Sequence, residues 1–164
     1  MARTVVYVQE HGYDTQEELL QYQKGVSEKG KTVSFSLADA SDKLKKTNEQ
    51  IHYTGQYYAS KALHAEFLKS RNKKQFREAH RTELDPYNDA VHYFKENGDG
   101  SIPSMKSLKE EKQQLTDFIK VQKTTLAAIR QEKKELQTAA SNIDAILRDA
   151  PSPKKEKDKA QPEL

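Results

Sequence analysis

The chain of 164 residues contains no cysteine and no tryptophan, and it has only six glycines and five prolines. Without cysteine there can be no disulfide bond, no thiolate zinc site and no cysteine nucleophile. Only 34% of the residues are hydrophobic, against a usual share of about 45–50% in globular domains. Because so few apolar residues cannot build a core of normal depth, a deep catalytic cleft is not expected.

Long apolar runs are missing as well. No stretch approaches the roughly 18 apolar residues of a membrane-spanning helix, and no basic start leads into an apolar segment with a cleavage site. We therefore expect neither a transmembrane segment nor a signal peptide, but a soluble cytoplasmic protein without a membrane partner. The sequence also offers no Gly-rich phosphate loop, and we expect no cofactor and no small-molecule substrate.

A long amphipathic helix is predicted from Leu37 onward, because apolar residues recur there at alternating steps of three and four. The β-branched residues Thr32 and Val33 weaken helix propensity, so we expect this helix to begin near residues 33–36 and to end near 70–72. Its seam comprises Leu37, Ala40, Leu44, Thr47, Ile51, Thr54, Tyr58, Lys61, Ala65 and Leu68, and Tyr57 and Leu63 widen the stripe.

A second long helix is predicted between Ser104, which can cap its start after Pro103, and a stop at residues 149–151. Its seam repeats the same spacing from Leu108 to Leu147. Since neither seam is apolar throughout, the two helices are expected to bury each other as a long antiparallel, coiled-coil-like hairpin. The residues expected to hold this hairpin include Leu44, Ile51, Tyr58, Leu115, Ile129, Leu136 and Ile143.

Shorter helices are predicted beside the hairpin. Residues 72–81 and 82–96 should form a small cap across one end of it, with Pro86 tolerated in a first helical turn. Residues 97–100 are all good turn formers and should close this cap.

The segment before the hairpin is also interpreted as helical. Residues 16–27 have a helical pattern after a cap at Asp14 or Thr15. Residues 4–9 are rich in β-branched side chains, but we predict helix there because no partner strand occurs elsewhere in the sequence.

The last 14 residues contain three prolines, four lysines and one bulky aliphatic side chain, so they cannot offset the entropy of ordering. The fold class expected for the whole chain is therefore all-α with a disordered C-terminal tail. The expected organisation is short N-terminal helices over 1–31, a helical hairpin over 32–150 with its cap at about 72–100, and the tail over 151–164.

Two groups of residues could carry chemistry, and for both a structural interpretation is favoured. Residues 97–102 match the centre of a calcium-binding loop, but Lys95 and Lys106 stand where its essential carboxylates belong. The second group comprises His52, Tyr53, Tyr57, Tyr58, Lys61 and His64. Metal-assisted strand cleavage needs ligands that converge on one ion, which five scattered histidines do not supply. We therefore predict no catalytic and no metal-binding residue, and tyrosines that pack on a helix seam.

Charge is segregated along the chain although the net charge is only +3. Residues 69–82 contain six cations and one anion, a net charge of +5, whereas residues 83–103 have a net charge of −4. The basic segment suits a phosphate backbone, which needs only point charges; the alternative is a solvated helix that faces the acidic segment. The candidate contacts to DNA, without sequence-specific readout, are Lys69, Arg71, Lys73, Lys74, Arg77 and Arg81.

Six segments carry one resemblance, which covers nearly the whole chain up to Arg148. They are residues 1–12 (MARTVVYVQEHG), 17–19 (EEL), 76–80 (FREAH), 102–109 (IPSMKSLK), 134–138 (KELQT) and 142–147 (NIDAIL). These segments resemble the C-terminal helical region of the relaxase/mobilisation nucleases of Gram-positive conjugative elements.

The resemblance implies a role in conjugation without catalysis. In that family a tyrosine nicks DNA and a histidine cluster holds a metal, both in an α/β domain that would precede this sequence and whose motifs are absent from it. We therefore expect a non-catalytic module, similar to a relaxase without its nuclease, that contacts DNA backbone or other transfer proteins. The alternative is a structural coiled-coil protein whose seams pair with a second copy or another helical protein, with no DNA role.

Overall fold

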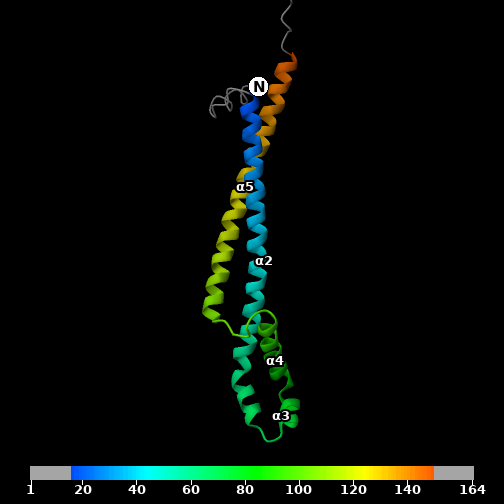
Figure 1. The fold of residues 1–164 in the computed structure, drawn as a ribbon, viewed down its shortest axis with the longest axis vertical. Coiled ribbons are helices and arrows are strands. Elements are labelled where there is room, and N and C mark those ends of the chain that lie inside the picture. The colour runs from blue at the N-terminus through cyan, green and yellow to red at the C-terminus, as the bar shows by residue number, and fades with distance from the viewer. Residues whose placement is uncertain (1–15, 150–164) are drawn as a thin grey trace, which may run out of the picture. The chain divides into compact units, whose positions relative to one another are not determined.

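The computed structural model describes residues 16–149, which form four helices and no strand (Figure 1). The helices are α2 (Gln16–Lys69), α3 (Lys73–Ala79), α4 (Arg81–Glu96) and α5 (Met105–Asp149). The predicted all-α class with its pair of long helices is confirmed. The predictions for residues 4–9, for a cap at Asp14 or Thr15 and for the tail over 151–164 lie outside the described residues.

Helix α2 begins earlier than expected. It runs without a break through Thr32 and Val33, so the helix start predicted near residues 33–36 is wrong. Close packing explains the continuity: a Cβ atom added at Gly30 would lie 3.3 Å from Cγ2 of Ile129 on α5. Contact with a partner helix stabilises a helical segment more than weak intrinsic propensity destabilises it.

The chain forms two compact units, and α2 and α5 contribute to both. The end unit comprises residues 1–30 and 127–164, and the middle unit comprises residues 31–126. In the end unit, the start of α2 packs against the last part of α5 through buried Leu19, Val26 and Leu136. Gln23 Nε2 donates to the Leu136 carbonyl oxygen at 3.0 Å, which ties the side chain of one helix to the backbone of the other.

In the middle unit, α2 and α5 meet along the predicted seams. The buried seam residues are Ala40, Thr47 and Thr54 on α2, and Leu108, Ile119 and Leu126 on α5. Thr47 Oγ1 lies 3.4 Å from Glu111 Oε1 across the pair. Helix α5 begins where the sequence predicted, with the Ser107 amide donating to the capping Ser104 Oγ at 3.4 Å.

Helix α4 packs on the last turns of α2 through aromatic rings. Its buried face consists of Leu84, Tyr87, Ala90 and Phe94. The Tyr93 ring stacks on Tyr53 with centroids 4.1 Å apart, and the Tyr87 ring stacks on His64 at the same separation. Offset stacks of this kind add to the free energy gained from area burial alone.

Beyond Thr54 the predicted seam of α2 is wrong by one residue. Tyr58 and Leu68 are 50% and 57% exposed, and the residues that face α3 and α4 lie one position earlier. They are Tyr57, which the prediction placed at the margin of the stripe, and Ser60, His64 and Phe67, which it left out. The shift arises because α2 changes partner: Met105, the first residue of α5, lies beside Gly55, and from there α4 takes its place.

Helix α4 also begins earlier than the sequence indicated. It starts at Arg81, so Pro86 lies in the second turn rather than the first. Proline has no N–H to donate to the carbonyl of Thr82, four residues before it, but Thr82 is exposed and water can reach that oxygen. Burial of Leu84, which is only 2% exposed, draws the chain before the proline into the helix.

Candidate nucleic-acid interface

The six candidate DNA contacts follow one another around the connection from α2 to α4. Helix α2 ends at Lys69, where the Ser70 amide donates to the Glu66 carbonyl oxygen at 3.0 Å. After Arg71, the Asn72 side chain caps α3 by accepting a hydrogen bond from the Gln75 amide at 3.1 Å. Lys73, Lys74 and Arg77 belong to α3, and Arg81 is the first residue of α4.

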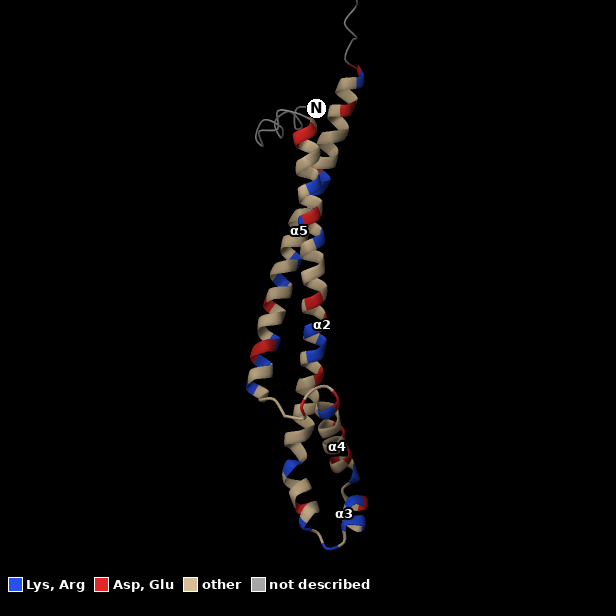
Figure 2. Cartoon of the chain, viewed as in Figure 1, with Lys and Arg blue, Asp and Glu red and all other residues tan. Residues whose placement is uncertain are grey.

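All six of these side chains are exposed. Figure 2 shows basic segments, in blue, around the connection from α2 to α4. Arg81 is the one that has an acidic partner, since its Nε lies 3.1 Å from Asp85 Oδ2. No other of the six forms an ion pair within residues 16–149. We name these five, Lys69, Arg71, Lys73, Lys74 and Arg77, the turn cluster.

The turn cluster is exposed, and none of its five cations forms an ion pair with another residue of the described range 16–149. If the cations faced the following acidic segment, several ion pairs would join the two, whereas only the Arg81–Asp85 pair does so in the part of the chain described. Unpaired surface cations create a local positive potential that attracts polyanions.

Aromatic contacts hold the turn cluster in place. Helix α3 has no buried residue of its own. Its Phe76 ring lies 6.1 Å from Phe67 of α2 and 4.5 Å from His80 at the start of α4. These ring contacts attach α3 to α2 and to the start of α4, and they fix the position of the helix that carries Lys73, Lys74 and Arg77.

Two tyrosines of the histidine and tyrosine group on α2 are parts of ring stacks. Tyr57 stacks on Tyr87 with centroids 5.1 Å apart, and Tyr53 stacks on Tyr93. Burial, followed by the neighbouring Tyr57, raises the pKa of Tyr87, and burial with the nearby Glu49 charge raises the pKa of Tyr93. A raised pKa disfavours the phenolate, so these two partners are not activated hydroxyls.

The calcium-like turn is satisfied by its own side chains. Asp99 Oδ1 accepts hydrogen bonds from the Ser101 amide at 2.9 Å and from Ser101 Oγ at 2.5 Å. These bonds lower the pKa of the Asp99 carboxyl, and Gly100 has the positive φ of 83° that the turn needs. Across residues 16–149, no group of three or more histidine, aspartate or glutamate side chains could hold a metal ion.

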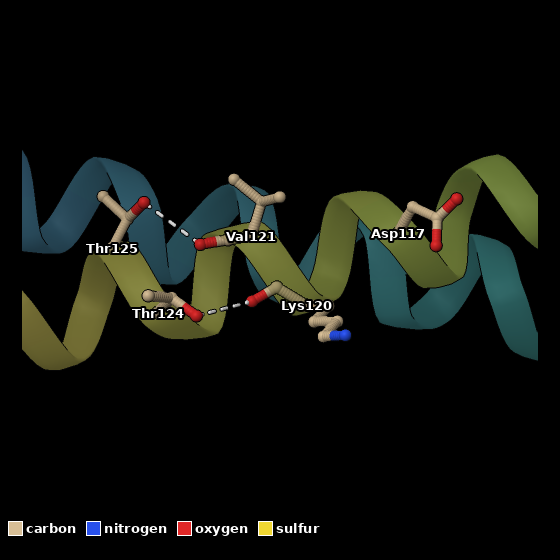
Figure 3. A pocket seen from close by; sticks show the side chains of 5 residues that line it. All are labelled: Asp117, Lys120, Val121, Thr124 and Thr125. Atoms are coloured by element: carbon tan, nitrogen blue, oxygen red, sulfur yellow. Dashed lines mark hydrogen bonds between the residues drawn. The ribbon is translucent and has the colours of Figure 1, made fainter.

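The sequence reasoning missed an apolar surface on the outer side of α5. A shallow hollow is lined there by Asp117, Lys120, Val121, Thr124 and Thr125 (Figure 3). The Thr124 and Thr125 hydroxyls donate to the carbonyl oxygens of Lys120 and Val121, so their methyl groups are left for the surface. Val121 is 60% exposed. The sequence feature that could have indicated this surface is Val121, an apolar residue that lies off the predicted seam.

Comparisons with known proteins found no match. None of the described helices is both long enough and apolar enough to cross a membrane. No family model matches the sequence, and no curated protein and no solved structure matches it either. The expected relationship to relaxases therefore stays a prediction from the six segments quoted above.

Proposed function

We propose that this chain is a non-catalytic helical module that binds the phosphate backbone of DNA through the turn cluster. The observation that supports the proposal is a set of five exposed cations, supported by aromatic contacts and without an acidic partner among the described residues. Phosphate contact needs charge at suitable spacing and no defined groove-reading element. Helix α3, with seven residues, offers no such reading helix, so binding is independent of base sequence.

The strength of binding follows from the number of phosphates that the turn cluster neutralises. Each neutralised phosphate on duplex DNA contributes about −0.9 to the slope of log K against log salt, so five cations give about −4.5. Affinity should therefore fall by about 500-fold between 50 and 200 mM salt, since this range is a fourfold change in concentration.

Fluorescence anisotropy with single-stranded and duplex oligonucleotides tests this proposal over the same salt range. In the test variant, Arg71, Lys73, Lys74 and Arg77 are changed to Ala. In the matched control, the exposed α5 residues Lys106, Lys109, Lys123 and Lys134 are changed to Ala. We expect the test variant to lose binding and the control to keep most of it. No binding at low salt, or equal losses in both variants, rejects the proposal.

The cellular setting of this activity rests on the resemblance alone. A module of a mobilisation protein would hold DNA near the transfer machinery while a separate nuclease performs the cleavage. A mobilisation assay that compares the wild-type chain with the turn-cluster variant measures this role, and unchanged transfer would contradict it.

The alternative function, a coiled-coil interaction module without a DNA role, is favoured by the hollow on α5. Val121, which lines the hollow, is 60% exposed, and Phe118, three residues earlier on α5, is 42% exposed. Apolar surface of this kind is common at protein interfaces. Changing both residues to Ser should abolish any association that persists at high salt. Sedimentation velocity measures this, and a wild-type chain that stays monomeric at high salt rejects self-association through the hollow.

A further inference from the structure

The turn that follows α4 contains two residues with chemistry of their own. Asn97 and Gly98 come directly after Glu96, the last residue of α4, in the connection to α5 (Figure 1), and both are exposed. Asn97 is the one asparagine of the sequence that precedes a glycine. An asparagine can react with its own backbone, because the amide nitrogen of the next residue is held close to the side-chain carbonyl carbon.

The attacking atom would be the backbone nitrogen of Gly98. Its N–H forms no hydrogen bond to another backbone group within residues 16–149, whereas the Asn97 N–H donates to the Tyr93 carbonyl oxygen at 3.0 Å. The peptide plane between the two residues must rotate from the observed Asn97 ψ of 6° to bring this nitrogen to Asn97 Cγ. Gly98 has no side chain, so neither a bulky group nor a backbone hydrogen bond resists that rotation.

The Asn97 side chain is held by one replaceable hydrogen bond. Its Nδ2 donates to the Tyr93 carbonyl oxygen at 3.0 Å, an acceptor that the Asn97 backbone N–H already uses. Because the side chain is exposed, water can replace this bond at little cost in free energy. The side chain can therefore turn toward the Gly98 nitrogen.

The next two residues, Asp99 and Gly100, could undergo a similar ring closure, but their reactive groups are engaged. The Gly100 N–H donates to the Phe94 carbonyl oxygen at 3.0 Å. Hydrogen bonds from the Ser101 hydroxyl and amide lower the pKa of the Asp99 carboxyl, and an ionised carboxylate resists nucleophilic attack. The turn therefore favours reaction at its first two residues over reaction at the next two.

We propose that Asn97 is a site of spontaneous deamidation, at which the chain modifies itself without an enzyme. The Gly98 nitrogen forms a bond to Asn97 Cγ, and the bond from Cγ to Nδ2 breaks. The proton lost from the Gly98 nitrogen leaves with the side-chain nitrogen as ammonia. Water then adds to either carbonyl carbon of the cyclic imide and opens the ring. One opening gives aspartate, and the other gives isoaspartate, whose main chain runs through the side-chain carbons.

Both products alter the end of α4. Each replaces a donor beside the Tyr93 carbonyl with a carboxylate, and negative charge at a helix C-terminus is unfavourable. Isoaspartate also lengthens the main chain just before the hydrogen bond from Gly100 to Phe94 that follows the helix. The modified chain should therefore lose hydrogen-exchange protection in the last turn of α4.

Peptide mapping by mass spectrometry tests the proposal on the full chain, incubated at neutral and at mildly alkaline pH. Asn97 should gain about 1 Da as NH₂ is replaced by OH, and isoaspartate should elute as a separate peptide. The rate should rise with pH, because the attacking nitrogen must lose its proton. The other asparagines are internal controls that should keep their mass: Asn48, Asn88 and Asn142 lie within helices, and Asn72 caps α3.

Gly98→Ala is the matched variant, and the structure accommodates it. A Cβ atom added at Gly98 would lie 3.6 Å from its nearest neighbour, the Phe94 carbonyl oxygen, and the φ angle of Gly98 is not positive. The added methyl group hinders ring closure, so deamidation of Asn97 should slow by about tenfold or more. No mass gain at Asn97, equal rates at all asparagines, or a Gly98→Ala chain that reacts as fast as wild type would each overturn the proposal.

This site is independent of the proposed DNA function. Asn97 follows the last residue of α4, whereas Arg81, next to the turn cluster, is the first. The incubated wild-type chain should therefore exchange the Asn97 and Gly100 amide protons faster while it keeps its affinity for DNA. Incubated Gly98→Ala should show neither change. A deamidated chain with unchanged exchange at these amides would contradict the expected effect on α4, and failure of DNA binding would leave the deamidation site standing.

Discussion

The end unit and the middle unit bury different kinds of residues between the same two helices. In the end unit, large aliphatic side chains meet, with Leu19 and Leu136 at 2% and 0% exposure. In the middle unit, the α2 side of the seam consists of small or polar residues, and Thr47 and Thr54 are as deeply buried as those leucines. The two regions are equally closed to water, but they differ in what burial contributes to stability.

This difference indicates a division of roles along the hairpin. Burial of an aliphatic side chain contributes about 1.5–3 kcal/mol, whereas a buried hydroxyl contributes little and costs free energy when it has no partner. Polar seam residues instead favour one register over others. The middle unit compensates through the aromatic stacks between α2 and α4, which have no counterpart among the described residues of the end unit.

The largest loss of stability is expected from removal of the Tyr87 ring in the middle unit. Tyr87 is 9% exposed and stacks on both Tyr57 and His64. Tyr87→Ala should lower the free energy of unfolding by about 4 kcal/mol, because it removes a buried ring and leaves a cavity. Urea denaturation followed by circular dichroism measures the change. Tyr58→Ala is the matched control, and equal losses in the two variants would contradict the aromatic account.

Leu136→Ala in the end unit should lower the free energy of unfolding by about 3 kcal/mol, since this side chain is fully buried in the aliphatic cluster. Hydrogen exchange should show the loss of protection in residues 16–30 and 127–149. Leu147→Ala, at a position that is 58% exposed, should change protection little. If both substitutions had the same effect, the cluster would not be what stabilises this unit.

Thr54→Val should raise the free energy of unfolding by about 1 kcal/mol. It tests whether the polar seam of the middle unit contributes less to stability than the aliphatic cluster of the end unit. The Thr54 hydroxyl is buried and has no hydrogen-bond partner among the described residues, and valine keeps the shape of the side chain. Thr47→Val is the control, because the Thr47 hydroxyl donates to the Lys43 carbonyl oxygen at 2.9 Å. In thermal unfolding, the melting temperature of Thr54→Val should be higher than that of the wild type, and that of Thr47→Val should be equal to it or lower.

The elements that sequence reasoning located well are those whose signals are local. The start of α5 follows from the Ser104 cap, and the seam up to Thr54 follows from its spacing. The seam beyond Thr54 could not be predicted, because its phase depends on which helix lies opposite. The same limit applies to the candidate site: the sequence locates the cations, but only the fold separates Arg81, which has a partner, from the turn cluster.

The smallest change in stability is expected at the glycines of α2, where the effect of a substitution depends on how closely α5 approaches. Nothing lies within 4 Å of a Cβ atom added at Gly25, so Gly25→Ala should raise stability by about 0.5–1 kcal/mol through helix propensity alone. At Gly30 the added atom would lie 3.3 Å from Ile129, and the gain should be smaller or reversed. Thermal unfolding of the two variants compares them directly. If Gly30→Ala stabilised the chain as much as Gly25→Ala, close approach of α5 would not explain why glycine stands at position 30.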